Sequence, residues 1–484
     1  LSGIPSLSEK STMRPPFKFA ARSFWLAGLL AATAPAQALT YAIDFVATAA
    51  GGAVMDPTGT LVAGLANLAP TCANCPPTFS VPSLWVNGQR FTLTLPADRA
   101  YIGLVGINAQ GWVVGNAWNG GSTTSTPTVW TVRADHSGVD RLDLAPLPGK
   151  ASAEATGIDR EGRIVGVSNT WFTSPEEPFL WTMTGGTVPL TTLGHGSEKP
   201  LGMSPGGTVG TASFTYTLGQ PASTVSVAPS PAGWRRESIL SLRINDRGDR
   251  AFGMLTTSSS PLYYIWRYQA EGVWQQIGLS GTGSMSTGGI GEIDAQGSVV
   301  GTQLSTGVRA EGPAGMLVPL TSLLSPAYAG VAINSGNDLG DGGVVLASAN
   351  IGRAARVAKL VPVSPCTSNC LRVSSLTVTG RIVYEPRKPG QCTARAKTAA
   401  SAQVKVVDEN GIAVRGAVVK GRFLDDYYLD GKVTLTTNSQ GNVTAQHSGP
   451  ACVGAIAFFI DSVTKAGRSL DRTSGVLTSF VIPQ

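Results

Sequence analysis

Residues 105–115 read Val-Gly-Ile-Asn-Ala-Gln-Gly-Trp-Val-Val-Gly, and this stretch decides the fold because its pattern recurs along the chain. An apolar residue stands before an Asn, Asp or Ser, variable positions follow, and a glycine leads into an apolar run. The pattern returns about every 40–50 residues in seven copies, at 55–59, 107–111, 158–162, 203–207, 244–248, 293–297 and 333–337. A repeat of this length indicates an architecture in which each unit completes its core against its neighbours.

Each copy predicts a tight turn between two strands. The Asn, Asp or Ser side chain can accept a hydrogen bond from a backbone N–H two residues later. The glycine three residues after it suits a positive φ, as in a turn followed by a bulge. In the seventh copy Asn337 replaces this glycine, and asparagine is the next most tolerant residue at a positive φ.

Four repeats carry a further strand that ends in tryptophan, at 83–85, 128–130, 179–181 and 264–266. A fourth apolar segment follows it, so each repeat holds about four short strands, which is typical of a β-propeller blade. The sequence therefore predicts an all-β protein in which residues 39–363 form a β-propeller of about seven blades. We expect residues 39–46 to close the ring by pairing with the last blade, which protects the sheet edges.

The pattern Gly-Ile-Asn/Asp-x-x-Gly-x-Val-Val-Gly, followed by Phe-Leu-Trp and Leu-x-x-Leu-Gly, resembles the HAF repeat of bacterial extracellular proteins. The copies at 107 and 158 match it best, although neither carries the His-Ala of the name, and the copies at 203 and 333 are degenerate. The resemblance covers roughly residues 53–363. It implies a propeller and a secreted protein, and it brings no catalytic residue with it.

Residues 1–38 are predicted to contain a signal peptide, with the first 12 residues upstream of it. A basic segment precedes the apolar stretch 24–33, and residues 36–38 read Ala-Gln-Ala, which is typical of a cleavage site before Leu39. The apolar stretch is too short to span a bilayer, and no later stretch approaches that length. We therefore expect a mature chain without a transmembrane segment, in an extracellular or periplasmic location.

After a linker with two cysteines at 364–372, the pattern changes. About seven short apolar strands in residues 373–484, separated by turns such as 408–411 and 438–441, favour an Ig-like β-sandwich. This part resembles the Ig-like modules appended to bacterial secreted enzymes and adhesins. The resemblance implies an accessory or spacer unit, which is an analogy at the level of the fold.

The composition agrees with a β protein that is rich in turns. Charged residues are 14% of the chain and glycine numbers 59. The formal charge is +6 for the whole chain and +3 without residues 1–38, and residues from 373 onward carry +5, so the repeats are near −2. A nearly neutral propeller argues against nucleic acid as a partner. We expect a monomer whose partner is a glycan or a cell-surface protein.

Six cysteines in an exported chain predict three disulfides. We expect local pairs, namely Cys72–Cys75, Cys366–Cys370 and Cys392–Cys452. The alternative is a zinc site, because ring closure would bring the first and last blades together; its ligands would be Cys72, Cys75, Cys366 and Cys370. A redox Cys-x-x-Cys is less favoured, since no helix start follows Cys72.

The sequence assigns no catalytic residue. It holds three histidines, of which His136 and His195 are expected in surface loops, and it lacks the P-loop and dinucleotide motifs. The string Gly-Met-Ser-Pro-Gly at 202–206 overlaps the repeated turn at 203–207, so it is not expected to form the strand-to-helix nucleophile elbow of a serine hydrolase. The densest acidic pairs are 176–177 and 425–426. Adjacent loop residues point apart, so these pairs do not supply the two facing carboxylates of a glycosidase.

Two aromatic positions are candidates for ligand contact. Trp118 and the pair Trp171-Phe172 occupy matching places after the second strand of adjacent repeats. Exposed rings there would stack on a sugar or anchor a protein partner, whereas the alternative is packing between blades. An oxygen-rich stretch with Asn334, Asp338 and Asp341 also suggests calcium, although it lacks the glutamate that ends an EF-hand loop. No other cofactor is predicted.

The favoured function is a secreted, non-catalytic binding or surface-interaction protein whose propeller loops form the ligand face. The first alternative is a secreted enzyme that degrades polysaccharide or protein with acidic residues on the propeller. A central funnel with two acids about 5–10 Å apart would support that alternative. The second alternative is a structural envelope protein.

Overall fold

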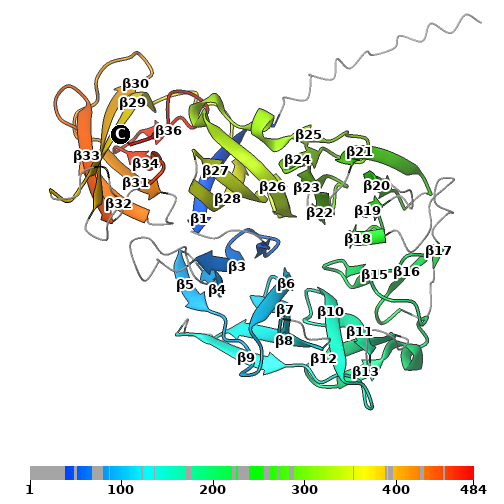
Figure 1. The fold of residues 1–484 in the computed structure, drawn as a ribbon. Coiled ribbons are helices and arrows are strands. Elements are labelled where there is room, and N and C mark those ends of the chain that lie inside the picture. Colours follow the sequence, from blue (N-terminus) through cyan, green and yellow to red (C-terminus); the bar gives the residue numbers. More distant parts are fainter. Residues whose placement is uncertain are drawn as a thin grey trace, which may run out of the picture. The chain divides into compact units, whose positions relative to one another are not determined.

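The computed structural model of the 484-residue chain describes residues 39–47, 52–67, 80–86, 88–120, 124–133, 135, 137–169, 176–220, 225–226, 239–255, 262–270, 272–282, 288–352, 354–386, 390, 396–425, 430–450 and 453–483. Their strands form nine four-stranded sheets, and the all-β prediction is confirmed (Figure 1). Short 3₁₀ turns accompany them, namely η1 (Leu190–Leu193), η3 (Leu320–Leu323), η4 (Pro326–Tyr328) and η5 (Asp341–Gly343). No helix within the ranges above is long and apolar enough to cross a bilayer.

Seven of the sheets each correspond to one sequence repeat, and we number them along the chain. In sheets 1–3 the strands pair antiparallel in chain order. Sheet 1 contains β2 (Val54–Met55), β3 (Leu61–Asn67), β4 (Ser80–Val86) and β5 (Gln89–Thr92). Sheet 2 contains β6 (Tyr101–Ile107), β7 (Trp112–Trp118), β8 (Ser125–Val132) and β9 (Val139–Asp143). Sheet 3 contains β10 (Ser152–Ile158), β11 (Ile164–Asn169), β12 (Glu177–Thr182) and β13 (Gly186–Pro189).

Sheets 4–6 repeat this order. Sheet 4 contains β14 (Gly202–Met203), β15 (Thr208–Gly210), β16 (Phe214–Thr217) and β17 (Val225–Ser226). Sheet 5 contains β18 (Ile239–Ile244), β19 (Arg250–Leu255), β20 (Leu262–Tyr268) and β21 (Trp274–Thr282). Sheet 6 contains β22 (Gly288–Ile293), β23 (Val299–Gln303), β24 (Thr306–Ala310) and β25 (Val318–Pro319).

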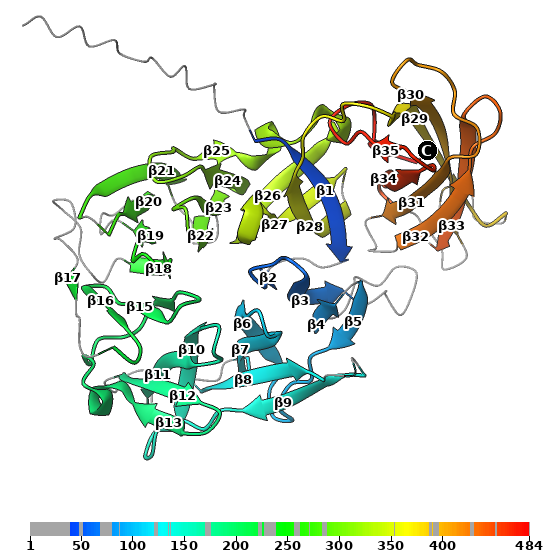
Figure 2. The same ribbon diagram turned by 180° about the vertical axis from the view of Figure 1, so that it is seen from behind.

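Sheet 7 combines the two ends of the repeat region. Its strands are β26 (Val331–Leu339), β27 (Val345–Ile351), β28 (Ala354–Pro362) and β1 (Tyr41–Ala47). β1 pairs antiparallel with β28, as predicted for a closing strand. The first strands of successive sheets contact one another, and β26 contacts β2, so the seven sheets form a closed, propeller-like series (Figure 2).

The predicted turn joins the first two strands in sheets 1–6. In sheet 2 the Oδ1 atom of Asn108 accepts the backbone N–H groups of Gln110 and Trp112 at 3.1 and 3.0 Å, and Gly111 has a φ of +81°. The Nδ2 atom of Asn108 donates to the carbonyl oxygen of Asp159 in sheet 3 at 3.1 Å. One side chain thus closes its own turn and connects two sheets.

The seventh turn differs from the prediction. β26 runs through residues 333–337 as a strand with bulges, so Asn337 does not replace a turn glycine. The turn comes six residues later, where the N–H of Gly340 donates to Val344 at 2.8 Å and Gly343 has a φ of +78°. The bulges lengthen β26 and the true copy has Gly340 in place of an Asx residue, which explains the misalignment.

The cores lie between adjacent sheets and contain the predicted tryptophans. Trp85, Trp130 and Trp181 are at most 6% exposed. Trp130 packs with residues of both sheets 1 and 2, and its Nε1 donates to the carbonyl oxygen of Thr94 at 2.9 Å. A buried indole with its N–H satisfied stabilises the contact between the sheets.

Basic side chains connect sheets 5, 6 and 7 to the sheet that follows each of them. Each extends from a third strand and donates to the carbonyl oxygen of the next turn glycine. The pairs are Arg267 with Gly297 (3.0 Å), Arg309 with Gly343 (3.1 Å) and Lys359 with Gly59 (3.0 Å). These bonds satisfy carbonyl groups that would otherwise lose hydrogen bonding on burial.

The remaining two sheets form a C-terminal unit. The first has the order β33 (Asn442–Pro450), β30 (Lys397–Asp408), β29 (Cys370–Val383) and β35 (Ser469–Leu470). The second has the order β32 (Asp430–Thr436), β31 (Val418–Asp425), β34 (Ile456–Thr464) and β36 (Thr478–Val481). This unit belongs to the same compact body as the seven sheets and shares an apolar core with sheet 7.

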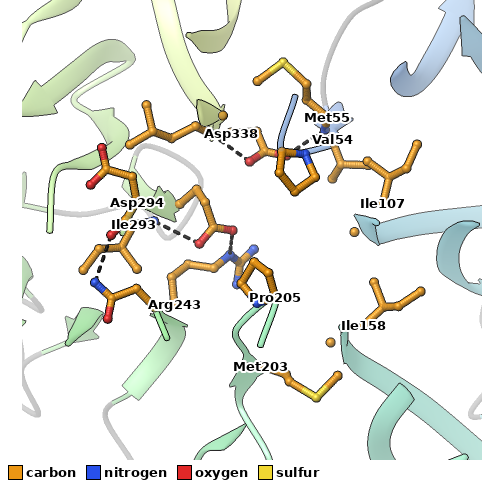
Figure 3. Close-up of a pocket in the computed structure, with 18 of the residues that line it drawn as sticks. Val54, Met55, Ile107, Ile158, Met203, Pro205, Arg243, Ile293, Asp294 and Asp338 are labelled. Atoms are coloured by element: carbon orange, nitrogen blue, oxygen red, sulfur yellow. Dashed lines mark hydrogen bonds and ion pairs between the residues drawn. The ribbon is translucent and has the colours of Figure 1, made fainter. Parts of the chain in front are cut away.

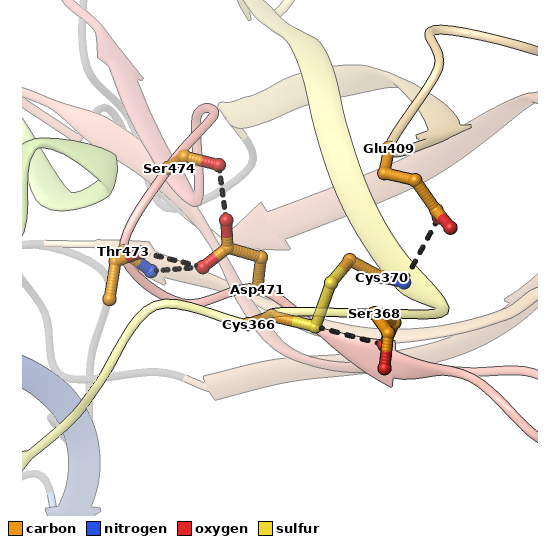
Figure 4. The surroundings of a disulfide bond; sticks show 7 residues. All are labelled: Cys366, Ser368, Cys370, Glu409, Asp471, Thr473 and Ser474. Carbon is orange, nitrogen blue, oxygen red and sulfur yellow. Dashed lines mark hydrogen bonds between the residues drawn. A yellow bond between two sulfur atoms is a disulfide. The ribbon is translucent and has the colours of Figure 1, made fainter.

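A disulfide joins Cys366 and Cys370 where β28 leads into β29 (Figure 4). The backbone N–H of Cys370 donates to the Glu409 carboxylate at 3.1 Å. Arg472 of the C-terminal unit donates to Ile43 and Asp44 of β1, at 2.7 Å in each case. These contacts attach the unit to the closing strand, whereas the resemblance to appended modules implied a spacer.

Candidate functional site

The residue directly before the repeated turn motif lines one cavity in all seven sheets. The cavity has a volume of about 150 Å³ and is lined by the ends of all seven first strands. In chain order the seven residues are Val54, Gly106, Gly157, Gly202, Arg243, Glu292 and Asp338. Four are small or apolar, and the three charged ones belong to successive sheets.

Close packing explains the glycines. A Cβ atom on Gly157 would lie 2.7 Å from the Cβ of Met203 in the next sheet. A Cβ atom on Gly202 would lie 2.9 Å from the carbonyl oxygen of Leu242. Such distances are shorter than van der Waals contact, so these two positions have no room for a side chain unless the next sheet moves.

The charged side chains come from sheets 5, 6 and 7. The Nε atom of Arg243 donates to the carbonyl oxygen of Gly291 at 2.8 Å and lies 3.6 Å from Oε2 of Glu292. The Asp338 carboxylate accepts the N–H of Met55 at 2.7 Å and the N–H of Leu339 at 2.8 Å. Asp338 therefore also connects sheet 7 to sheet 1.

Bulges precede both carboxylates. The strand register shifts between Ile290 and Glu292 in β22 and between Gly336 and Asp338 in β26. A bulge adds a residue to one strand and redirects the side chains that follow it. The register also shifts before Gly106 in β6 and before Gly157 in β10, so the bulge is shared with glycine positions and does not by itself distinguish the acidic ones.

Burial raises the pKa of both carboxyl groups. The pKa of Glu292 rises to about 7 because the surroundings desolvate the group, although Arg243 opposes the shift. The pKa of Asp338 rises to about 6 for the same reason, against the opposing hydrogen bonds from Met55 and Leu339. Glu292 nevertheless keeps 30% of its side chain exposed, so it is accessible from the cavity while carrying a perturbed pKa.

The opposite part of the cavity is apolar. Figure 3 shows Ile107, Ile158 and Met203 facing Arg243 and Asp338 across the cavity. The cavity thus combines apolar side chains on one side with polar groups on the other, a combination that occurs in ligand sites.

An ion pair lies among the turns that line the cavity. Arg160 of the sheet 3 turn is 3.2 Å from Asp246 of the sheet 5 turn, and Asp246 accepts the N–H of Gly206 between them at 2.6 Å. The charged residues of the lining are Arg160, Arg243, Asp246, Glu292, Asp294, Asp338 and Asp341. With every group ionised, the lining carries a formal charge of −3.

Trp118 lies away from this cavity. It ends β7 and pairs with Tyr101 at the start of β6, whereas Val105–Ile107 at the other end of β6 line the cavity. The rings of Trp118 and Tyr101 are stacked, with centroids 6.3 Å apart and planes at 23°. Tyr101 is 54% exposed. Trp171 and Phe172 lie outside the described residues, so the predicted pairing of aromatic positions stays a prediction.

The calcium candidates do not form an oxygen cage. Asn334 lies within β26, and Asp341 is exposed on the turn that follows. Each oxygen of Asp338 already accepts a backbone N–H. Within the described ranges, no group of three or more His, Cys, Asp or Glu residues is placed to hold a metal ion.

One of the predicted disulfides is confirmed, between Cys366 and Cys370, with an S–S distance of 2.04 Å. Because these two cysteines bond to each other, the alternative zinc site that used both of them is wrong. The other two predicted pairs, from Cys72, Cys75, Cys392 and Cys452, lie outside the described residues.

The other titratable candidates have structural surroundings. His195 lies in the loop after η1, partly exposed, where it stacks on Tyr216 with ring centroids 4.3 Å apart and burial lowers its pKa. His447 lies on β33, stacks on Phe423 at 5.2 Å and has its pKa lowered by burial. His136 lies outside the described residues.

The two acidic pairs do not come together. Glu176 pairs with Lys199 at 2.8 Å, and Glu177 pairs with Lys150 at 3.4 Å. Asp425 is buried at the end of β31, and Asp426 lies outside the described residues. Glu176, Glu177 and Asp425 are not among the residues that line the cavity.

Sequence reasoning missed Arg243 and Glu292, although the signal is present. Aligning the repeats on their turns places Arg243, Glu292 and Asp338 in the position that is glycine in three other copies. The misaligned seventh copy hid Asp338 from this comparison. A charged residue in place of glycine in three successive repeats is the pattern that would have identified the site.

No protein-family model matches the chain, and no curated protein does either. A gluconolactonase from Xanthomonas campestris is similar in structure, with 10% identity, a TM-score of 0.35, and coverage of 67% of this chain and 91% of that chain. Sucrose-6-phosphate hydrolase from Lactobacillus gasseri has 9% identity, a TM-score of 0.25 and coverage of 76% and 85%. Prolyl oligopeptidase B from Galerina marginata has 7% identity, a TM-score of 0.30 and coverage of 72% and 53%. Similarities this weak assign no activity to this chain.

Proposed function

We propose that this chain is a secreted, non-catalytic binding protein of the HAF-repeat type, built as a seven-bladed β-propeller with an Ig-like sandwich. Its ligand site is the cavity between the first strands. The observation that carries this proposal is the two-sided lining of the cavity, in which Arg243 and Asp338 face apolar side chains (Figure 3). Glu292 lines the same cavity beside Arg243. Such a surface favours a small ligand with one polar end and one apolar end.

The aromatic pair Tyr101–Trp118 is the second contact surface in this proposal. Stacked rings with one exposed member offer a face to a sugar ring or to an apolar side chain of a partner. Because this pair lies at the other end of β6, a glycan or cell-surface protein bound there leaves the cavity accessible.

The cavity function is tested with a small-molecule library and ligand-observed NMR. Val54→Phe fills the cavity without changing a charged group, and Leu142→Phe on the exposed face of β9 is the matched control. We expect compounds that bind the wild type and the control variant but not Val54→Phe. Compounds that bind all three proteins equally would place the binding site elsewhere.

A second function, acid–base hydrolysis, is favoured by one observation. Two carboxyl groups with raised pKa values, Glu292 and Asp338, line the same cavity, and a glycosidase needs a protonated and an ionised carboxyl group. Against it, both oxygens of Asp338 hold backbone N–H groups. Turnover of chromogenic glycosides by the wild type and its loss in Glu292→Gln would establish this function in place of binding alone.

A further inference from the structure

The charge of the cavity restricts the ligand. Five carboxylates and two arginines contribute to its lining, and Arg160 and Asp246 neutralise each other. With that pair set aside, Arg243 is the remaining cation among the described residues of the lining, beside Glu292, Asp294, Asp338 and Asp341. An excess of negative charge in a confined volume attracts a cation and repels an anion.

Arg243 does not neutralise Glu292 fully. Its Nε donates to the carbonyl oxygen of Gly291 at 2.8 Å, and its Nη1 donates to the carbonyl oxygen of Leu242 at 3.0 Å. The backbone therefore fixes the guanidinium group, and the 3.6 Å between Nε and Oε2 of Glu292 exceeds a hydrogen bond. Oε1 of Glu292 accepts the backbone N–H of Ile293 at 2.9 Å, so it is Oε2 that retains capacity for a stronger donor that enters the cavity.

The apolar side argues for an organic cation. Ile107, Ile158 and Met203 offer only carbon and sulfur to a ligand opposite the carboxylates. A hard metal ion such as Ca²⁺ or Mg²⁺ prefers oxygen ligands on all sides, whereas a primary alkylammonium ion has a charged head with three donors and an apolar chain. The two ends of such a molecule match the two sides of the cavity.

We infer that the cavity binds an aliphatic primary ammonium ion, with the ammonium group on Glu292 and the carbon chain against Ile107, Ile158 and Met203. This inference rests on the proposed binding function and names its ligand class. The ligand belongs to the chemistry of alkylamines, aliphatic diamines or an exposed lysine side chain. The carboxylate accepts the N–H donors, and no covalent step is involved.

The charge of Glu292 makes this binding depend on pH. The groups that face Glu292 are Arg243, Asp338 and Asp294, while Asp56 also acts on Asp338. Burial raises the pKa of Glu292 to about 7, so a bound cation must displace a proton below that pH. The ionised fraction is then about 3% at pH 5.5, and affinity should fall about 30-fold between pH 8 and pH 5.5.

Isothermal titration calorimetry with n-butylammonium, n-butanol and butyrate tests the inference at pH 8. We expect n-butylammonium to bind, n-butanol to bind at least about tenfold more weakly, and butyrate not to bind. Glu292→Gln should lose at least about tenfold in affinity for n-butylammonium. Asp140→Asn is the matched control, since it removes a carboxylate from an exposed ion pair far from the lining.

The outcomes separate the inference from the proposed function. If n-butanol or butyrate binds as well as n-butylammonium, and Val54→Phe removes that binding, the cavity function holds and the ammonium class is wrong. If n-butylammonium binds Glu292→Gln with unchanged affinity, or binds the wild type equally at pH 5.5 and pH 8, the role of Glu292 is wrong. If no probe binds and no library compound distinguishes Val54→Phe from the wild type, both proposals fail.

Discussion

Two halves of the repeat series use the same backbone position in opposite ways. In sheets 2, 3 and 4 the residue before the turn motif is glycine, and a Cβ atom at these positions would lie 3.3, 2.7 and 2.9 Å from atoms of the next first strand. In sheets 5, 6 and 7 the same position carries Arg243, Glu292 and Asp338. In sheets 2–4 this position therefore allows the first strands to pack closely, whereas in sheets 5–7 it carries a charged side chain that lines the cavity.

Sheets 5–7, which carry the charged residues, have side-chain hydrogen bonds from their third strands to the following turn glycine that are not found for the described residues of sheets 2–4. Arg267, Arg309 and Lys359 donate to the turn glycines that follow them, and Asp338 connects sheet 7 to sheet 1. Charged groups in a confined site are costly unless they are hydrogen-bonded. We infer that the charged residues of the lining depend on these hydrogen bonds, whereas the glycine positions depend on the close approach of neighbouring first strands.

The largest effect on stability is expected when a glycine of sheets 2–4 is replaced by a charged residue of the kind that sheets 5–7 carry at the same position. Gly157→Glu places a side chain where Met203 leaves 2.7 Å for a Cβ atom, so it should reduce the free energy of unfolding by about 3 kcal/mol or more. Urea denaturation measures the change. Gly289→Ala in β22 is the control, because the added Cβ atom would meet no other atom within 4 Å, and it should change stability by less than about 0.5 kcal/mol. Wild-type stability of Gly157→Glu would show that packing does not determine the glycine.

The sequence predicts the turns of the repeats but not the cavity. The Asn, Asp or Ser side chain and the glycine of each turn act within five residues, so six turns, including those at Asn108 and Asp159, could be predicted locally. The seventh was misplaced because a bulge in β26 depends on pairing with β27, which local patterns do not encode. The cavity could not be predicted because it arises when residues such as Val54 and Asp338, far apart in the chain, meet.

The next largest effect concerns the connection between sheets 7 and 1. Asp338→Ala removes the acceptor for the N–H groups of Met55 and Leu339, and two buried donors without a partner should reduce the free energy of unfolding by about 2 kcal/mol. Asp338→Asn keeps one acceptor oxygen and should fall between the two proteins. Equal stability of the alanine variant and the wild type in urea would mean that water replaces the carboxylate at no cost.

A smaller effect of opposite sign is expected at Glu292. Its pKa rises from an ordinary 4.5 to about 7 in the folded protein, so the folded state binds the proton more tightly than the unfolded state. The stabilising contribution is present below pH 4.5 and is lost as pH rises through 7. Glu292→Gln should therefore be more stable than the wild type at pH 8, on the order of 1 kcal/mol, and equally stable at pH 4. Thermal unfolding at the two pH values measures this, and a variant less stable than the wild type at pH 8 contradicts it.

The smallest effect on stability is expected at Tyr101, which begins β6 in sheet 2 at the end of the strand opposite the cavity. Its ring is 54% exposed, so Tyr101→Ala should change the free energy of unfolding by less than about 0.5 kcal/mol. Trp118→Ala should cost more, because the Trp118 ring covers Gly103, where a Cβ atom would meet it at 3.3 Å. On a glycan array both variants should lose retention, since each removes one ring of the stacked pair. Retention by Tyr101→Ala equal to that of the wild type would leave Trp118 as a packing residue of sheet 2 and limit ligand binding to the cavity.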